Sequence, residues 1–514
     1  MLLVASCTNG DDSGDPDGPP AVEGNLKVGL PGPIALDPSL ASLAEASELL
    51  TVDLLYDGLT SLDPEGTPIP GLATTWDTDA EQRLWRFRLD ADRTFASGRP
   101  ITPADVVASL TWLARRGDTS LAALRLEAIT GFRALVDGTA PTLEGVRVAE
   151  DGAVEIALDT PLSTLPVLLA GPSYGIVDPN TIAAAATTGV DAVDPTGGWT
   201  ATPTTGGGLV LEERPGSPGR LDALELVPHE DAGGAYAAFE AGEVDWAEVP
   251  DGRVGDAVEA YGDDAFAPFH AELYFGLNLR SATLTNDGLR TAIARAVDRD
   301  AIVGAVYPDL ALPLSQVVPA GVPGRAADPC ATCGFDPAAA RSALEEAFPD
   351  GNVPIVPIDF DQSPAQEAMA RIVADNLDAV GIPTELRPRP IDEYKQFVVG
   401  GAHELFSFGW IGAYASPDAY LAPLFASASD DNLVGVASED LDELLLAARA
   451  HPPGAENLDR WAQAERRLLE AAVVVPIAQF RTLAVVSDRV AGWEHRVDGT
   501  IDWSAVSLGE GASR

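Results

Sequence analysis

Residues 353–391 read as a strand, a helix and a second strand in direct succession. Ser363 and Pro364 open a helix between two extended apolar runs, and Met369 and Leu377 fall on the helix face that would meet a core. Two strands joined through a helix normally lie parallel in one sheet, with a right-handed connection. This unit therefore predicts an α/β chain whose sheets are flanked by helices.

Residues typical of helix ends indicate further helices. Thr102 is placed to cap a helix that has Pro103 at its first position and Asp105 in its first turn, and Gly117 follows its basic last turn. Short strands separated by glycine- and proline-rich segments are expected between 195 and 227. Other helices are expected over residues 45–56, 287–306, 336–348, 438–450 and 457–472.

The charge of the chain limits the classes of partner that it can bind. Its 514 residues include 79 Asp and Glu against 32 Lys and Arg, which gives a formal net charge of −47. Such a chain repels phosphate backbones and anionic lipid headgroups, so we expect no nucleic-acid partner. The length predicts roughly two to four domains. No apolar run in the sequence approaches the roughly 20 residues that a membrane-spanning helix needs.

Residues 1–24 are expected to form a tether. Val4-Ala5-Ser6-Cys7 resembles a bacterial lipobox, in which small residues precede a cysteine that becomes lipidated. The stretch that follows, residues 8–20, is rich in Gly, Asp, Pro and Ser and has almost no apolar surface to bury. We therefore expect Cys7 to carry the lipid that anchors the protein to the outer face of the cell membrane. The alternative is a frayed tail with an incidental thiol.

Cys330 and Cys333 form a C-x-x-C motif between Pro329 and Gly334. The motif fits a thioredoxin-like redox pair, half of a zinc site or a small disulfide loop. A structural zinc site needs four ligands, but the sequence has no second cysteine pair and its five histidines are scattered. A structural disulfide outside the cytoplasm is the favoured interpretation, with a catalytic disulfide as the alternative. We expect no metal and no cofactor.

Several segments, in chain order, resemble one protein family. Among them are DLLYDGLTSLDPEGTPIPGLATTWDT (53–78), WRFRLDADRTFASGRPITPADVVASL (85–110), AFEAGEVDW (238–246) and YFGLNLRSATLTNDGLRTAIARAVDRDAI (274–302). They resemble the family 5 extracellular solute-binding proteins, the peptide- and nickel-binding subunits of ABC importers. The resemblance implies a bilobal periplasmic-binding-protein-like fold of type II, in its large three-domain form, with mixed sheets flanked by helices.

The resemblance also implies a division of the chain. The core domain of the first lobe would be discontinuous and would combine residues 25–52, 196–274 and 476–514. Residues 53–195 would form an additional domain of that lobe, and residues 275–475 would form the second lobe.

The resemblance further implies where a solute binds. In peptide-binding members, the segment matching 409–421 supplies a tryptophan and, three residues later, an aspartate that pairs with the ligand's terminal ammonium. Trp410 matches the tryptophan, but Ala413 stands at the position of the aspartate. A buried ammonium without a paired charge is costly, which argues against the usual binding mode for free amino termini. Asp418 is the alternative acid in this segment.

The second wall of the cleft is expected at LDPSLASLA (36–44), which resembles a segment whose backbone pairs with an extended peptide. Backbone pairing is indifferent to the peptide's side chains, and aromatic residues would add apolar walls with polar edges. The candidate ligand-binding residues are Ser42, Ala44, Tyr274, Gly409, Trp410, Ile411, Tyr414 and Tyr420.

These features predict a monomeric, lipid-anchored receptor outside the cytoplasm that delivers a peptide or other small solute to the permease subunits of an ABC importer. One rival is a secreted serine hydrolase, because GPSYG (171–175) fits the G-x-S-x-G pattern with Ser173 at its centre. In a hydrolase a helix follows that serine directly, whereas IVDPN follows here. A second rival is a lipoprotein sensor or chaperone on the same scaffold.

Overall fold

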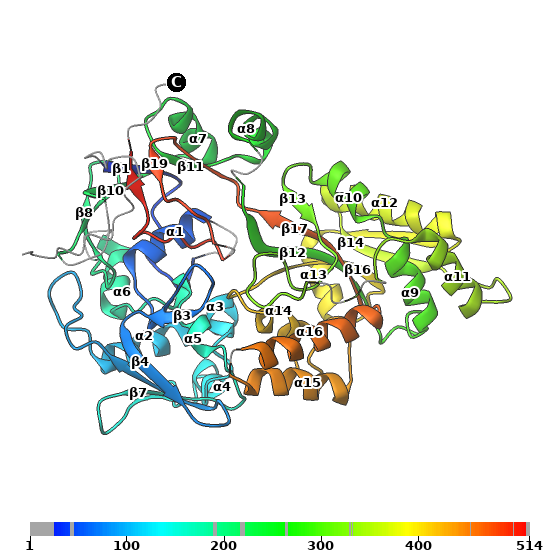
Figure 1. The fold of residues 1–514 in the computed structure, drawn as a ribbon, viewed down its shortest axis with the longest axis horizontal. Coiled ribbons are helices and arrows are strands. Elements are labelled where there is room, and N and C mark those ends of the chain that lie inside the picture. The colour runs from blue at the N-terminus through cyan, green and yellow to red at the C-terminus, as the bar shows by residue number, and fades with distance from the viewer. Residues whose placement is uncertain are drawn as a thin grey trace, which may run out of the picture.

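The computed structural model describes residues 25–41, 46–188, 193–215, 221–262, 266–327, 330, 333–452, 454–496 and 498–509. The chain forms two bodies that lie side by side, with the long strands β12 (Pro268–Leu277) and β17 (Val474–Arg481) at the junction between them (Figure 1). Cys7, Ser42 and Ala44 lie outside the described residues.

A six-stranded sheet from distant segments organises the first body. Its central strand β1 pairs in parallel with both β10 and β11, and β18 pairs antiparallel with β11. Leu26, Val28 and Leu30 of β1 are almost fully buried, as expected for a strand inside a sheet. In order, the strands are β18 (Ala484–Val486), β11 (Trp246–Glu248), β1 (Asn25–Pro31), β10 (Ala223–His229), β9 (Leu209–Glu213) and β8 (Trp199–Pro203).

In the first body, the remaining described strands form three smaller sheets. A four-stranded antiparallel sheet lies below the first sheet in Figure 1, and two sheets have two strands each. The strands are β4 (Ala73–Thr78), β5 (Leu84–Leu89), β7 (Val154–Ala157) and β6 (Val146–Val148), then β2 (Thr60–Leu62) with β3 (Pro68–Pro70), and β19 (Val490–Ala491) with β20 (Ser507–Leu508).

The second body is built on a mixed six-stranded sheet. Its strands β14 and β15 pair in parallel from Val356 opposite Thr384 to Asp361 opposite Arg389, and α12 connects them. The predicted strand–helix–strand unit with parallel strands is therefore confirmed. In order, the strands are β13 (Ala311–Pro313), β17, β12, β16 (Leu405–Ile411), β14 (Val356–Asp361) and β15 (Thr384–Arg389).

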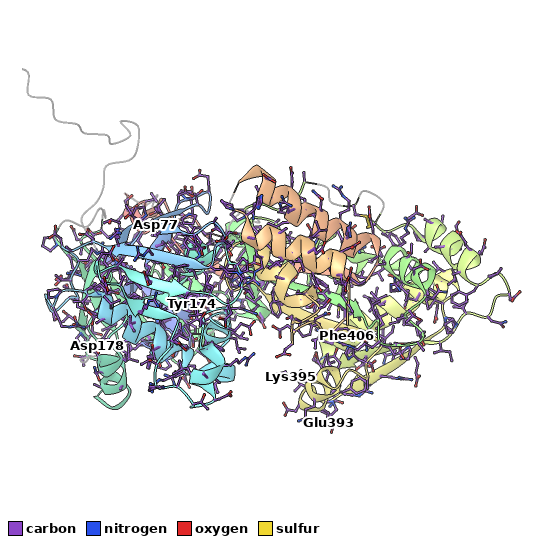
Figure 2. All side chains as sticks on the ribbon, turned by 90° about the horizontal axis from the view of Figure 1, so that it is seen from below. Asp77, Tyr174, Asp178, Glu393, Lys395 and Phe406 are labelled. Carbon is purple, nitrogen blue, oxygen red and sulfur yellow. A yellow bond between two sulfur atoms is a disulfide. The ribbon has the colours of Figure 1, made fainter. Side chains whose placement is uncertain are left out.

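Helices flank the sheets of both bodies. Those of the first body are α1 (Ala46–Leu55), α2 (Pro103–Ala114), α3 (Leu121–Leu124), α4 (Phe132–Val136), α5 (Leu165–Leu168), α6 (Pro179–Thr188), α7 (Ala232–Glu240) and α8 (Val254–Tyr261). Those of the second are α9 (Asp287–Ala296), α10 (Arg299–Val306), α11 (Pro337–Ala347), α12 (Pro364–Val380), α13 (Ile391–Val399), α14 (Asp418–Phe425), α15 (Glu439–Ala450) and α16 (Ala455–Glu470). Figure 2 shows Tyr174 in the first body and Phe406 in the second, with Glu393 and Lys395 of α13 at the second body's lower surface.

One helix prediction is wrong. A single helix was expected over 287–306, but the chain leaves the helical conformation at Val297 and Asp298. The Asp298 carboxylate accepts a hydrogen bond from the Ala301 N–H and so starts α10 as a new helix. Aspartate is a strong N-cap residue, and its competing bond to the backbone ends one helix and begins the next.

The two bodies share buried apolar side chains. One hydrophobic cluster runs from Phe87 and Phe132 of the first body to Tyr414, Phe425 and Trp461 of the second. Helices α14, α15 and α16 therefore pack toward α4 and α5 without a break in the core, as Figure 1 shows for α4 and α15. The predicted domain boundaries at 274/275 and 475/476 fall inside β12 and β17, and the division of the chain into domains stays a prediction.

Candidate binding cleft

A cavity of about 380 Å³ lies where the two bodies meet. The first body contributes residues from 62–66 and from 492–505, and the second contributes residues from 321–323 together with Ala415. Ala267 and Pro268, at the start of β12, close it at the junction of the bodies. A cavity with walls from two bodies is the usual place for a small-molecule or peptide site.

One edge of β16 is open near the end of the strand, and Ala415, which follows β16 in the chain, lines this cavity. The Gly412 N–H donates to the His270 carbonyl, so Gly412 and every second residue before it bond toward β12. Gly409 and Ile411 therefore turn their N–H and C=O groups to the opposite edge. On that edge β14 pairs with β16 only at Leu405 and Phe406, and no other described strand continues the pairing. Within the described residues, the backbone groups of Gly409 and Ile411 therefore have no strand partner and can pair with an added strand.

Trp410 lies between the two bodies and is 8% exposed. Its indole Nε1 donates to the Ala419 carbonyl at 2.8 Å, and its ring stacks on Phe408. From the first body, the guanidinium of Arg125 lies 4.6 Å from the centroid of the Trp410 ring. Arg125 also pairs with Asp431 of the second body at 3.5 Å. Trp410 is thus held in place by its own body and covered by the other.

The three candidate tyrosines are buried, and none of them lines the cavity. Tyr420 donates from its hydroxyl to the His270 carbonyl at 3.1 Å, and the Tyr274 ring contacts that of Phe408. Burial raises the pKa of the Tyr274, Tyr414 and Tyr420 hydroxyls well above the ordinary value, so they stay protonated. These side chains pack in the core and support the β16 edge from within the protein.

The segment after β16 has no free acid for a ligand. Ala413 is 7% exposed, and Asp418 is 1% exposed, with one carboxylate oxygen hydrogen-bonded and the other within ion-pair distance of an arginine. Asp418 Oδ2 accepts from the Tyr414 hydroxyl at 2.5 Å and from Thr164 Oγ1 of the first body at 3.1 Å. Asp418 Oδ1 lies 3.1 Å from Arg449 Nε. The carboxylate of Asp418 therefore ties the two bodies together and is not available in place of the missing aspartate.

Acidic side chains line the first-body wall of the cavity. Glu494, Asp498 and Asp502 lie there with His495 and Arg496. Burial lowers the pKa of His495 to about 4, so this imidazole is neutral near pH 7. This wall could not be predicted from the sequence, because Asp498 and Gly499 carry only a turn signal.

The remaining candidates among the described residues do not line the cavity. Cys330 is bonded to Cys333, with their Cα atoms 5.4 Å apart. Ser173 is 2% exposed in a 3₁₀ turn over Pro172–Tyr174, and no described residue hydrogen-bonds to its hydroxyl. The first helix after it, α6, begins at Pro179, so Ser173 does not lie on a strand-to-helix elbow. Within the described ranges, no group of three His, Cys, Asp or Glu residues is arranged to hold a metal ion.

Known proteins with similar sequences are solute-binding proteins. The chain is 20% identical to the oligopeptide-binding protein OppA of Bacillus subtilis, over 96% of this chain and 94% of that protein. It is 23% identical to the periplasmic oligopeptide-binding protein OppA of Escherichia coli, over 85% and 84%. The heme-binding protein A of Haemophilus influenzae is 26% identical over 53% of this chain and 51% of that protein.

Solved structures share the fold. The murein tripeptide-binding protein MppA in its unliganded open form superposes with a TM-score of 0.84 at 20% identity, over 96% of this chain and 99% of that one. The OppA of Listeria monocytogenes bound to peptide superposes with a TM-score of 0.64 at 18% identity, over 95% and 99%. In the described part of the chain, no helix is both long and apolar enough to span a membrane. Residues 67–432 match the family described as "Bacterial extracellular solute-binding proteins, family 5 Middle", and the chain belongs to this family.

Proposed function

We propose that the protein is a lipid-anchored extracytoplasmic receptor that binds a peptide in the cleft between its two bodies and delivers it to the permease subunits of an ABC importer. The protein would act as a monomer and leave its solute chemically unchanged. The observation that carries the proposal is the edge of β16 at Gly409 and Ile411, which no described strand covers, together with a cavity that has walls from both bodies.

The open edge favours a peptide as the ligand, because the backbone of an extended peptide can form hydrogen bonds with the backbone groups at this edge. A peptide that pairs with Gly409 and Ile411 adds one strand to the sheet of the second body, and its own backbone supplies the hydrogen bonds. Ser42 and Ala44 would pair from the other side, as the family resemblance implies. Closure of the two bodies would then remove the peptide from water and give the importer a shape to recognise.

Trp410 and the tyrosines act in this proposal by holding the edge in position. Gly412 allows the close approach behind it, because a Cβ at this position would overlap the Tyr420 hydroxyl. The Tyr414, Tyr420 and Trp410 side chains all make hydrogen bonds that fix the turn after β16. A site built on a rigid strand edge is preorganised for its ligand.

Methylation of the peptide backbone tests this mode of binding. A tetrapeptide selected as the tightest binder from a randomised library would be compared, by isothermal titration calorimetry, with versions that are N-methylated at one internal amide each. At least one methylated version should bind about 10-fold or more weakly, because it loses a hydrogen bond to the β16 edge and leaves a protein group unpaired.

The matched control changes side chains and leaves the backbone intact. Replacing the side chain at each internal position of the same tetrapeptide by one of similar size should change the affinity by less than about 3-fold. If every N-methylated peptide bound as tightly as the parent, pairing along Gly409 and Ile411 would be refuted.

A further inference from the structure

We propose that the solute extends from the cavity between the two bodies into a second cavity in the first body, and that Arg496 binds its backbone where the two cavities meet. This inference rests on the proposed peptide-binding function and adds the class of solute, a peptide long enough to occupy both cavities. It assigns a ligand-binding role to a region of the first body in which the sequence predicted no site residue.

The second cavity has a volume of about 600 Å³ and is lined by separate parts of the first body. Residues from 53–94 and 170–172 form one side, and residues from 197–215 and 496–504 form the other. Arg214 ties the two sides together, because its guanidinium donates to the Thr94 carbonyl at 2.8 Å and to the Thr94 hydroxyl. A cavity of this size with fixed walls lies within the usual range for a ligand site.

The second cavity adjoins the cavity between the bodies. The residues that line both are Leu62, Pro64, Arg496 and Asp502. The cavity between the bodies is the smaller of the two, at about 380 Å³. A solute that fills it and continues past these four residues enters the second cavity, and Arg496 then lies beside its path.

Arg496 has hydrogen-bond donors to offer at this junction. Its side chain is 19% exposed, and its guanidinium donates no hydrogen bond to any described residue. Asp502 Oδ2, at 3.8 Å, is near enough for an ion pair but too far for a hydrogen bond. The other arginines among the described residues of this wall are engaged, Arg93 by Asp57 and Arg214 by backbone carbonyl groups. Mostly buried N–H groups without acceptors are costly, and a peptide backbone supplies a carbonyl acceptor at every residue.

The walls of the second cavity suit peptide side chains. Ile69 is 39% exposed and Trp503 is partly buried, and both present apolar surface to the cavity. A hydrogen bond from Trp503 Nε1 to Asp53 Oδ2 at 3.2 Å holds the indole in place. Ser61, which is exposed on β2, adds a hydroxyl group to the wall. Contacts with this mixed apolar and polar surface add to the affinity of a solute that reaches it.

Peptide length tests the second cavity. Native mass spectrometry would measure the binding of a randomised tetrapeptide library with free amino termini and of a randomised octapeptide library of the same kind. An extended octapeptide is about 13 Å longer than a tetrapeptide, so the longer peptide reaches further into the second cavity. The wild-type protein should bind octapeptides about 10-fold or more tightly than tetrapeptides.

Two variants locate the effect. Ser61→Trp places a large side chain on the wall of the second cavity and should remove most of the preference for octapeptides. The same change should alter the binding of tetrapeptides by less than about 3-fold, which also shows that the variant is folded. Arg496→Met keeps a long side chain without its donors and should reduce the preference by about 5-fold or more.

Thr75→Trp is the matched control, because Thr75 is exposed on β4 and lines neither cavity. This variant should keep the wild-type preference. If the wild type bound octapeptides and tetrapeptides equally, or if Ser61→Trp and Arg496→Met both kept the full preference, the second cavity would be refuted as a binding site while peptide binding would stand. If the wild type bound no member of either library, the proposed function would fail and the role of the second cavity with it.

Discussion

Replacing Asp418 by alanine is expected to lower the free energy of unfolding by about 3 kcal/mol. Asp418 is 1% exposed and accepts hydrogen bonds from Tyr414 and from Thr164 of the other body. It also faces Arg449, whose side chain is 24% exposed. Without the carboxylate, a mostly buried guanidinium and two buried hydroxyls lose their partner, and breaking a buried pair costs far more than breaking a surface pair.

Chemical denaturation followed by circular dichroism measures this effect. Asp418→Asn keeps the shape of the side chain and one acceptor oxygen, so its loss of stability should be intermediate. Asp440→Ala removes an aspartate from an exposed ion pair with Arg467 and should cost no more than about 1 kcal/mol. An Asp418→Ala variant as stable as Asp440→Ala would show that the buried carboxylate does not join the two bodies.

Glu465 is expected to make the protein less stable as the pH rises toward 8. Its side chain on α16 is 1% exposed, and burial raises its pKa from 4.5 to about 7. Hydrogen bonds from the Val317 and Val318 N–H groups to Oε1 oppose this rise but do not cancel it. The nearby Glu272 is also 1% exposed, and burial raises its pKa well above the usual range.

The sign of the effect follows from where the protons bind. Between pH 4.5 and about 7 the folded state holds a proton on Glu465 that the unfolded state releases, so a higher pH favours unfolding. The stabilising contribution is complete below pH 4.5 and is lost as the pH rises through about 7. The loss at pH 8 is about 3 kcal/mol, from about 1.4 kcal/mol for each unit of the pKa difference.

Glu465→Gln tests this expectation, because the amide oxygen can still accept from Val317 and Val318 while the titration is removed. The variant should be more stable than the wild type by about 3 kcal/mol at pH 8, and the difference should disappear below about pH 4.5. Glu443→Gln, at an exposed position on α15, should show no such trend. A stability difference between Glu465→Gln and the wild type that stays constant from pH 4 to pH 8 would contradict the assignment.

The elements that local signals define were predicted well from the sequence. The Thr102 N–H donates to the Asp105 carboxylate at the start of α2, where the cap was expected. The parallel pair β14 and β15 follows from a helix placed between two apolar runs. The break between α9 and α10 was missed, because the signal of Asp298 as a helix cap was outweighed by the apolar pattern on both sides of it.

The cleft itself could not be predicted from local signals. Trp410 was singled out by resemblance. That Arg125 covers its ring could not be predicted, because the two residues lie far apart in the sequence and meet only when the two bodies pack together. Asp418 was considered as a ligand acid, and only the positions of Thr164 and Arg449 show that its carboxylate is engaged. The acidic wall at Glu494 and Asp498 depends on the C-terminal segment lying against the start of β12.

The most direct test of strand addition at β16 is hydrogen–deuterium exchange at the Gly409 and Ile411 amides, read by mass spectrometry with residue-level fragmentation. In the free protein no described strand pairs with these amides, so they should exchange rapidly. Addition of the randomised tetrapeptide library with free amino termini should slow the exchange of both amides by about 10-fold or more. If the library bound and protected other segments while the exchange at Gly409 and Ile411 stayed unchanged, the solute would not add a strand to β16, and the account of binding would be wrong.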